Sequence, residues 1–198
     1  MKRIRYSDPK KLRALAVIAA SCHRFYCSHK YTRYELLDSI YVRQDGWAFA
    51  TNSYVMLCAF DPGLKLSRPT DNNYLLKISP HEISSGTVLA VHASQVHEAA
   101  GNPWPTIDSV VPDGIEKIQP AEYVGLGGCW AVNAVQRILD PSIKNEGIWA
   151  KASLGRAVWI TPNEEWKDVL LVYQGMGSDA DQSGLKLVNE KIARIKGE

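Results

Sequence analysis

The stretch from Tyr34 to Phe60, YELLDSIYVRQDGWAFATNSYVMLCAF, limits the folds open to this chain more than any other segment. It contains three runs of apolar, aromatic and β-branched residues, which favour strands. Asp45-Gly46 separates the first two runs, and Asn52-Ser53 separates the last two. Because a tight hairpin turn needs positive φ, an Asp-Gly pair between two such runs is a strong hairpin signal. The stretch therefore predicts a three-stranded antiparallel meander, with Ile40–Val42 paired to Ala48–Ala50.

Two segments have the periodicity of amphipathic helices. Asp8 and Pro9 suit the N-cap and the first position of a helix, and the leucines and alanines that follow recur at helical spacing. We expect one helix over Asp8–Ala20 and a second over Trp130–Leu139. A further helical turn is expected within Ser94–Ala100. The other expected strands are Lys2–Tyr6, Tyr74–Ile78, Thr87–His92, Ile148–Ala152, Arg156–Thr161 and Val169–Gln174.

The two longer helices are each followed by three strand-like runs. This repeated order predicts an α+β fold, in which two helix-plus-antiparallel-strands units form one domain. We place that single domain at residues 1–177, with units of about 1–93 and 94–177. Residues 178–198 are expected to form a linker and a short C-terminal helix over Leu185–Lys196, partly frayed.

Composition supports a folded protein and assigns no function. The 198 residues are 45% hydrophobic, which is ample for a core, and the formal net charge is only +2. The four cysteines lack the spacing of a disulfide framework, and no run approaches the roughly 18 apolar residues of a spanning helix. We expect a reduced, cytoplasmic protein that does not associate with a membrane.

The segment Cys22–Lys30, CHRFYCSHK, gathers two cysteines and two histidines. Structural zinc usually takes pairs of ligands from separate knuckles, and this spacing fits no such site. We interpret the segment as a loop with ordinary thiols and imidazoles, and expect no metal and no other cofactor. The chain also lacks the common hydrolase and phosphate-loop motifs. One enzymatic alternative stays open, a small enzyme with an unrecognised Cys/His site, because such partners need be close only in space.

Two motifs resemble the bacterial sliding-clamp family, which includes the beta subunit of DNA polymerase III. The family carries an Ala-Thr-Asp-Gly-x-Arg-Leu segment after its first helix and strand, and Ala50–Met56, ATNSYVM, is similar to it. The proline-bounded segment Asn102–Pro112 resembles the linker between units of a clamp domain. This chain departs from the family pattern at Asn52, where the family has Asp, and at Val55, where it has Arg.

The resemblance implies a DNA-clamp-like fold and a non-enzymatic role on DNA or on DNA-replication proteins. In this family the helices face double-stranded DNA, so the resemblance implies non-specific phosphate contacts and a homo-oligomer. This chain supplies one clamp domain where a bacterial clamp subunit has three, so a closed ring would need several copies. A compact clamp-like protein would suit a phage. The alternative is an interaction module that binds or mimics a replication or repair partner, with Trp104 as its exposed anchor. The expected DNA-binding residues are Lys10, Lys11, Arg13, Arg24 and Arg137.

Overall fold

The structure is a computed structural model. It describes residues 2–26, 37–52, 55–64, 73–83, 88–91, 96–98, 107–111, 115–120, 134–135, 137–139, 148–152, 156–160, 168–174 and 185–197. The chain separates into two compact units. The first comprises Met1–Ser53 and Ala59–Trp104, and the second comprises Tyr54–Cys58 and Pro105–Glu198.

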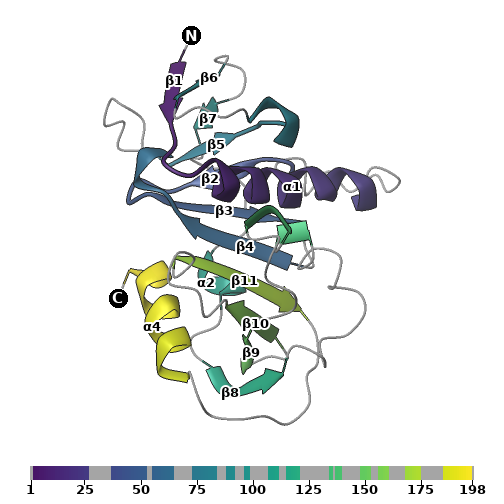
Figure 1. The fold of residues 1–198 in the computed structure, drawn as a ribbon, viewed down its shortest axis with the longest axis vertical. Coiled ribbons are helices and arrows are strands. Elements are labelled where there is room, and N and C mark those ends of the chain that lie inside the picture. Colours follow the sequence, from purple (N-terminus) through teal and green to yellow (C-terminus); the bar gives the residue numbers. More distant parts are fainter. Residues whose placement is uncertain are drawn as a thin grey trace. The chain divides into compact units, whose positions relative to one another are not determined.

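The first unit is a helix packed on an antiparallel sheet with the strand order β7-β5-β2-β3 (Figure 1). Its first strand lies outside that sheet, because β1 pairs antiparallel with β6 in a separate two-stranded ribbon. Helix α1 lies against β3 and β2 and against the short 3-10 helix η3. The elements are β1 (Lys2–Arg5), α1 (Pro9–Tyr26), β2 (Ile40–Val42), β3 (Trp47–Thr51), η2 (Pro62–Leu64), β5 (Tyr74–Leu76), η3 (Pro80–Glu82), β6 (Val88–Val91) and β7 (Val96–Glu98).

The predicted β2–β3 hairpin is confirmed. Tyr41 stands opposite Phe49 and Val42 opposite Ala48, as the pairing of Ile40–Val42 with Ala48–Ala50 requires. Gly46 has a φ of 100°, and its amide donates to the Arg43 carbonyl at 3.0 Å. A Cβ at Gly46 would also lie 3.1 Å from the Cα of Pro62, so glycine is needed for both conformation and space.

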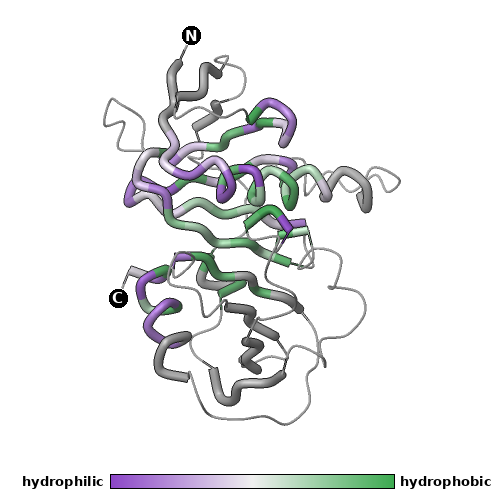
Figure 2. The backbone as a smooth tube through the Cα atoms, in the orientation of Figure 1, coloured by the Kyte–Doolittle hydropathy of each residue, from purple (hydrophilic) through white to green (hydrophobic). Residues whose placement is uncertain are grey.

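The buried apolar residues of the first unit come from α1 and from both faces of its sheet. All five residues of β3 are buried, and the register places Ile40, Val42 and Leu76 on one face of the sheet and Phe49 and Leu75 on the other. Figure 2 shows β3 in white to green, without a strongly hydrophilic position. The residues that are no more than 1% exposed include Leu12, Ala14, Leu15, Ala16, Ile18 and Ala19 from α1 and Ile40, Val42, Phe49, Leu75 and Leu76 from the strands.

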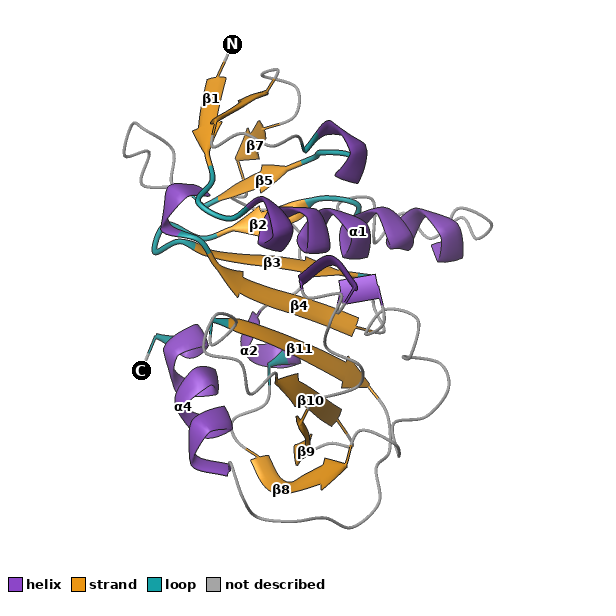
Figure 3. Cartoon of the chain, in the orientation of Figure 1, coloured by secondary structure: helices purple, strands orange, loops and turns teal. Residues whose placement is uncertain are grey.

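The second unit has the strand order β4-β11-β10-β9-β8. Strands β10 and β11, β10 and β9, and β8 and β9 pair antiparallel. Helix α4 lies beside β8, as the cartoon in Figure 3 shows. The described parts of the expected second helix, 134–135 and 137–139, are helical. The remaining elements are β4 (Val55–Phe60), α2 (Ile107–Val110), β8 (Ile115–Pro120), β9 (Ile148–Ala152), β10 (Arg156–Ile160), β11 (Val169–Gln174) and α4 (Leu185–Lys196).

The α+β fold class is confirmed, and two local predictions are wrong. Cys22–Tyr26 continues α1 instead of forming a loop, because its change of pattern contains no Gly or Pro to stop a helix. Residues 37–39 form a turn before β2, and β2 has the bounds Ile40–Val42 that the predicted hairpin requires. Within Ser94–Ala100, Val96–Glu98 is strand β7, because pairing with β5 overrides the local helical pattern.

Candidate nucleic-acid interface

The candidate interface is the start of α1, where the sequence places its densest predicted DNA-contacting residues. Asp8 caps this helix as predicted, since its Oδ1 accepts from the backbone amides of Lys10 at 2.9 Å and Lys11 at 3.3 Å. The carbonyl of Asp8 accepts from the Leu12 amide at 3.2 Å. The first turn of α1 is therefore fixed by its own N-cap.

A second carboxylate holds the chain just before that turn. Asp61, at the end of β4, is 2% exposed, and its Oδ2 accepts from the backbone amides of Ser7 at 2.9 Å and Asp8 at 3.2 Å. The Ser7 hydroxyl also donates to Asp61, and so does the Gly63 amide, at 2.8 Å. A Cβ at Gly63 would lie 3.0 Å from both Asp61 Oδ1 and Ser7 N, so the backbone approach requires glycine. These contacts fix the direction in which β1 enters α1.

The three predicted basic residues of the first turns differ in their surroundings. Lys10 is exposed. Lys11 is half-buried, and its Nζ donates to the Phe60 carbonyl at 3.4 Å. Arg13 is exposed, and its Nη2 donates to the Ile83 carbonyl at 2.8 Å.

Both contacts orient the side chains without neutralising them. A backbone carbonyl has no net charge, and a guanidinium has five N–H donors, of which the Ile83 carbonyl takes one. The two cations therefore keep their charge and are held near the start of α1. Such pre-positioned cations suit phosphate, which they bind through charge and without reading sequence.

The other predicted site residues lie in other parts of the chain or outside the residues that the structure describes. Arg24 belongs to α1, but its side chain lies outside the described part of the chain. Arg137 is exposed and belongs to the second unit. Trp104 lies outside the described residues. Among the predicted residues whose side chains the structure describes, Lys10, Lys11 and Arg13 lie together at the start of α1.

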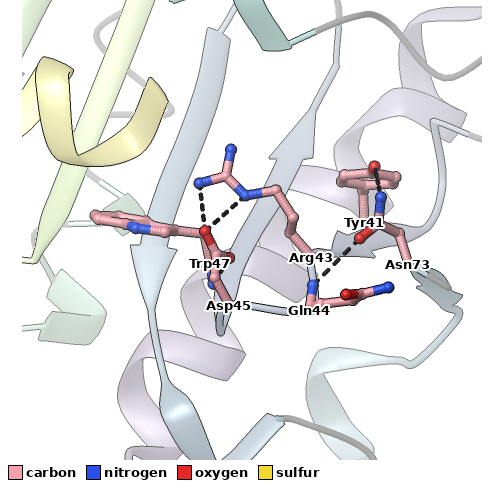
Figure 4. A network of polar contacts seen from close by, with 6 residues as sticks. All are labelled: Tyr41, Arg43, Gln44, Asp45, Trp47 and Asn73. Carbon is pink, nitrogen blue, oxygen red and sulfur yellow. Dashed lines mark hydrogen bonds and ion pairs between the residues drawn. The ribbon is translucent and has the colours of Figure 1, made fainter. Parts of the chain in front are cut away.

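The sequence analysis did not predict a polar network that lies at the tip of the β2–β3 hairpin (Figure 4). Arg43 Nε donates to Asp45 Oδ2 at 2.9 Å, and the guanidinium carbon lies 5.5 Å from the centroid of the Phe49 ring. Oδ1 of Asp45 accepts from the Trp47 amide at 3.1 Å. Burial raises the pKa of the Asp45 carboxyl, but the hydrogen bonds from Arg43 and Trp47 outweigh it and leave the pKa below its usual value.

Asn73 extends this network to strand β5. Its Nδ2 donates to the Tyr41 hydroxyl at 2.6 Å, and its Oδ1 accepts from the Gln44 amide at 3.2 Å. Burial raises the pKa of the Tyr41 phenol, so the hydroxyl stays neutral at physiological pH. Because Arg43 is paired with Asp45, this network closes the hairpin and does not offer an unneutralised cation for DNA.

The motif that carries the sequence resemblance has a packing role here. Asn52 is fully buried, and its Nδ2 donates to the Ser21 hydroxyl at 2.9 Å. Ser21 in turn donates to the Ile18 carbonyl of α1 at 2.6 Å. Val55, at the position of the family's Arg, is 2% exposed. The end of β3 is therefore tied to the middle of α1 by a buried amide.

The described residues form neither a cluster that could hold a metal ion nor a membrane-spanning helix. No three His, Cys, Asp or Glu residues of the described ranges are grouped so that they could hold a metal ion. In those ranges, no helix combines the length and the apolar character needed to span a bilayer.

The architecture is similar to two solved bacterial sliding clamps. With DNA polymerase III subunit beta from Borrelia burgdorferi the TM-score is 0.53 at 11% identity, over 88% of this chain and 63% of that one. With the DNA polymerase sliding clamp from Bacillus subtilis the TM-score is 0.50 at 13% identity, over 89% of this chain and 64% of that one. The matches span less than two thirds of each clamp's length.

No protein-family model and no curated protein matches the chain. At 11–13% identity the likeness concerns the fold alone. The chain is therefore a divergent clamp-like domain, as the two sequence motifs implied.

Proposed function

We propose that this chain is a sliding-clamp-like protein that acts, without catalysing a reaction, on double-stranded DNA or on DNA-replication proteins. The observation that carries the proposal is the clamp-like fold, which extends over 88% of the chain. In this proposal the two units form one clamp-like domain over residues 1–177, and several copies of a cytoplasmic, phage-encoded protein assemble on DNA. The proposed protein acts by its position on DNA, which requires no cofactor.

The start of α1 supports a DNA contact of the required kind. A protein that moves along a duplex needs contacts that do not depend on sequence, and cations near phosphates provide them. Lys10, Lys11 and Arg13 lie within the first turns of one helix, and the carbonyls of Phe60 and Ile83 orient two of them. Arg24 and Arg137 are the further proposed contacts. No base-reading side chain is required by this model.

The test is the salt dependence of duplex binding. Fluorescence anisotropy with a labelled duplex of arbitrary sequence should give a log–log slope of roughly −0.9 per phosphate contacted. Changing Lys10, Lys11 and Arg13 together to Ser removes up to three contacts and should flatten the slope by up to about 2.7. A duplex of different sequence should bind with the same affinity.

The structure sets the controls for this test. Arg13 and Lys11 each donate to a carbonyl, so the triple variant loses two internal hydrogen bonds, worth roughly 0.5–3 kcal/mol each. The single variant Lys10→Ser should flatten the slope by about 0.9. Replacing Lys77, whose side chain is 57% exposed, with Ser removes one charge elsewhere in the first unit and should leave the slope unchanged. An unchanged slope in the triple variant contradicts the proposed contact.

The second candidate is a protein-interaction module that binds or mimics a replication or repair partner, with Trp104, which lies between two prolines, as its anchor. In that case the intact protein does not bind a duplex even at low salt, and a replication protein is the partner. Trp104→Ala is then the first variant to examine. Light scattering of the purified chain separates the models further, because a closed ring requires several copies and a monomer excludes that mechanism.

A further inference from the structure

The strongest concentration of positive charge in the chain begins before α1. Residues 1–13 contain six of the 23 Lys and Arg residues, and the one acid among them is Asp8. The Asp8 carboxylate is occupied as the N-cap of α1. About a quarter of the basic residues therefore lie in one short segment, and α1 accounts for only half of those six.

The other half lie on strand β1, opposite apolar residues. In the antiparallel β1–β6 ribbon, Lys2 stands opposite Val91, Arg3 opposite Ala90 and Arg5 opposite Val88. Directly opposite residues are the nearest cross-strand neighbours, and an acid there would pair with a cation. All four residues of β6, VLAV, are apolar, so the ribbon itself supplies no such acid. Strand alternation places Arg3 and Arg5 on the same face.

The β1–β6 ribbon and helix α1 are held in a fixed relative direction. Only Tyr6, Ser7 and Asp8 connect β1 to α1, and Tyr6 is 2% exposed. Asp61 accepts from the amides of the other two, and β1 also lies against η2. The six basic residues are thus carried by two elements of fixed relative direction, unlike those of a mobile tail.

We propose that the β1–β6 ribbon is a second contact for the phosphate backbone of double-stranded DNA, with Arg3 and Arg5 as its principal residues. This inference rests on the proposed function, since it names a further surface for the same partner. A two-stranded ribbon is narrow enough to lie along a duplex groove, and Arg binds phosphate through several N–H donors. In the sequence, Asp8 is the one acid between Arg5 and Lys10, and the Asp61 carboxylate that holds the backbone between them is 2% exposed.

The experiment compares two variants with equal charge. Arg3→Ser with Arg5→Ser removes two charges from the ribbon, and the control Lys77→Ser with Arg194→Ser removes two charges from side chains that are 57% and 51% exposed. The ribbon variant should flatten the salt slope of duplex binding by about 1.8, and the control should leave it unchanged. The variant Arg3→Lys with Arg5→Lys retains the charge and should keep the slope of the parent. Circular dichroism and thermal melting establish whether each variant is folded.

Each outcome decides between the two proposals. If the parent binds the duplex and the ribbon variant keeps its slope, the ribbon contact is refuted while the proposed function stands. If the parent binds no duplex, the proposed DNA function fails first. If the double Ser variant is unfolded, the single variants Arg3→Ser and Arg5→Ser take its place, and each should flatten the slope by about 0.9; an unchanged slope in both refutes the ribbon contact. Loss of slope in the Lys variant overturns a charge-based contact, and equal binding of the parent to anionic vesicles overturns DNA as its partner.

Discussion

Helices α1 and α4 each cover apolar residues of their own unit, but they are fixed in place from opposite ends. The backbone that enters α1 is held by the carboxylate of Asp61, which is 2% exposed. Helix α4 is held by two basic side chains, the buried Lys191 in its middle and Arg194 in its last turn. Lys191 donates to the Val169 carbonyl at 3.4 Å, and Arg194 pairs with Asp168 at 2.8 Å.

The signs of these charges follow the helix macrodipole. A carboxylate is favoured at the amino end of a helix and a cation at its carboxyl end. The two charges at the helix ends differ in burial, because Asp61 is 2% exposed while the Arg194 side chain is 51% exposed. Exposed ion pairs contribute little to stability, whereas a buried carboxylate that accepts several N–H donors costs much to disturb. The comparison therefore predicts a strong anchor at Asp61, before α1, and a weak one at Arg194, in the last turn of α4.

Both helices should contribute equally to stability through their buried apolar side chains. The loss of such a side chain is the largest expected effect. Leu15 of α1 and Ile195 of α4 are both 0% exposed, so each change to Ala should lower the free energy of unfolding by roughly 2–5 kcal/mol. Urea unfolding measures both, with the partly exposed Val17→Ala as the control in α1. A cost below about 1 kcal/mol for Ile195→Ala would show that α4 is a dispensable tail.

The two anchoring carboxylates, Asp61 and Asp168, should differ in their contribution to the free energy of unfolding. Asp61→Asn leaves one carbonyl oxygen in place of a carboxylate that accepts from two amides before α1, a hydroxyl and the Gly63 amide, and it should cost roughly 1.5–3 kcal/mol. Asp168→Asn removes the half-exposed pair with Arg194 and should cost under about 1 kcal/mol. If urea unfolding gives equal losses of free energy for the two variants, the predicted difference between the anchors is contradicted.

The smallest effect concerns the hairpin that lies under α1. Because the folded-state pKa of Asp45 is lowered from 3.8, the stability it contributes is present above that value and is lost as pH falls through the lower folded-state pKa. The Asp45 side chain is 47% exposed, so screening keeps the contribution of its pair with Arg43 under about 0.5 kcal/mol. Asp45→Asn keeps an oxygen for the Trp47 amide and should unfold with a weaker dependence on acid. Urea midpoints at neutral and acid pH measure this, and an unchanged dependence would contradict a native pair.

Local signals in the sequence were sufficient where one short segment decides the structure. The Asp45-Gly46 turn, the Asp8 N-cap, strands β9 and β11 and the bounds of α4 follow from turn chemistry, capping and patterning. Strand β7 and the position of Asp61 did not, since both depend on partners far along the chain. The same holds at the candidate site. The presence of Lys11 and Arg13 on a basic helix was visible, but the Phe60 and Ile83 carbonyls that orient them were not.

The contact between Asp61 and Ser7 also bears on the order in which this chain folds. The two residues are 54 positions apart, so the group that fixes the entry to α1 is synthesised well after the helix itself. Residues of α1 are free to become helical early through their own cap, but closing so long a loop has an entropic cost that only the completed meander repays. On a ribosome, the helix should therefore dock only after β4 has emerged. Until then its apolar face and its basic start remain accessible to other molecules in the cell.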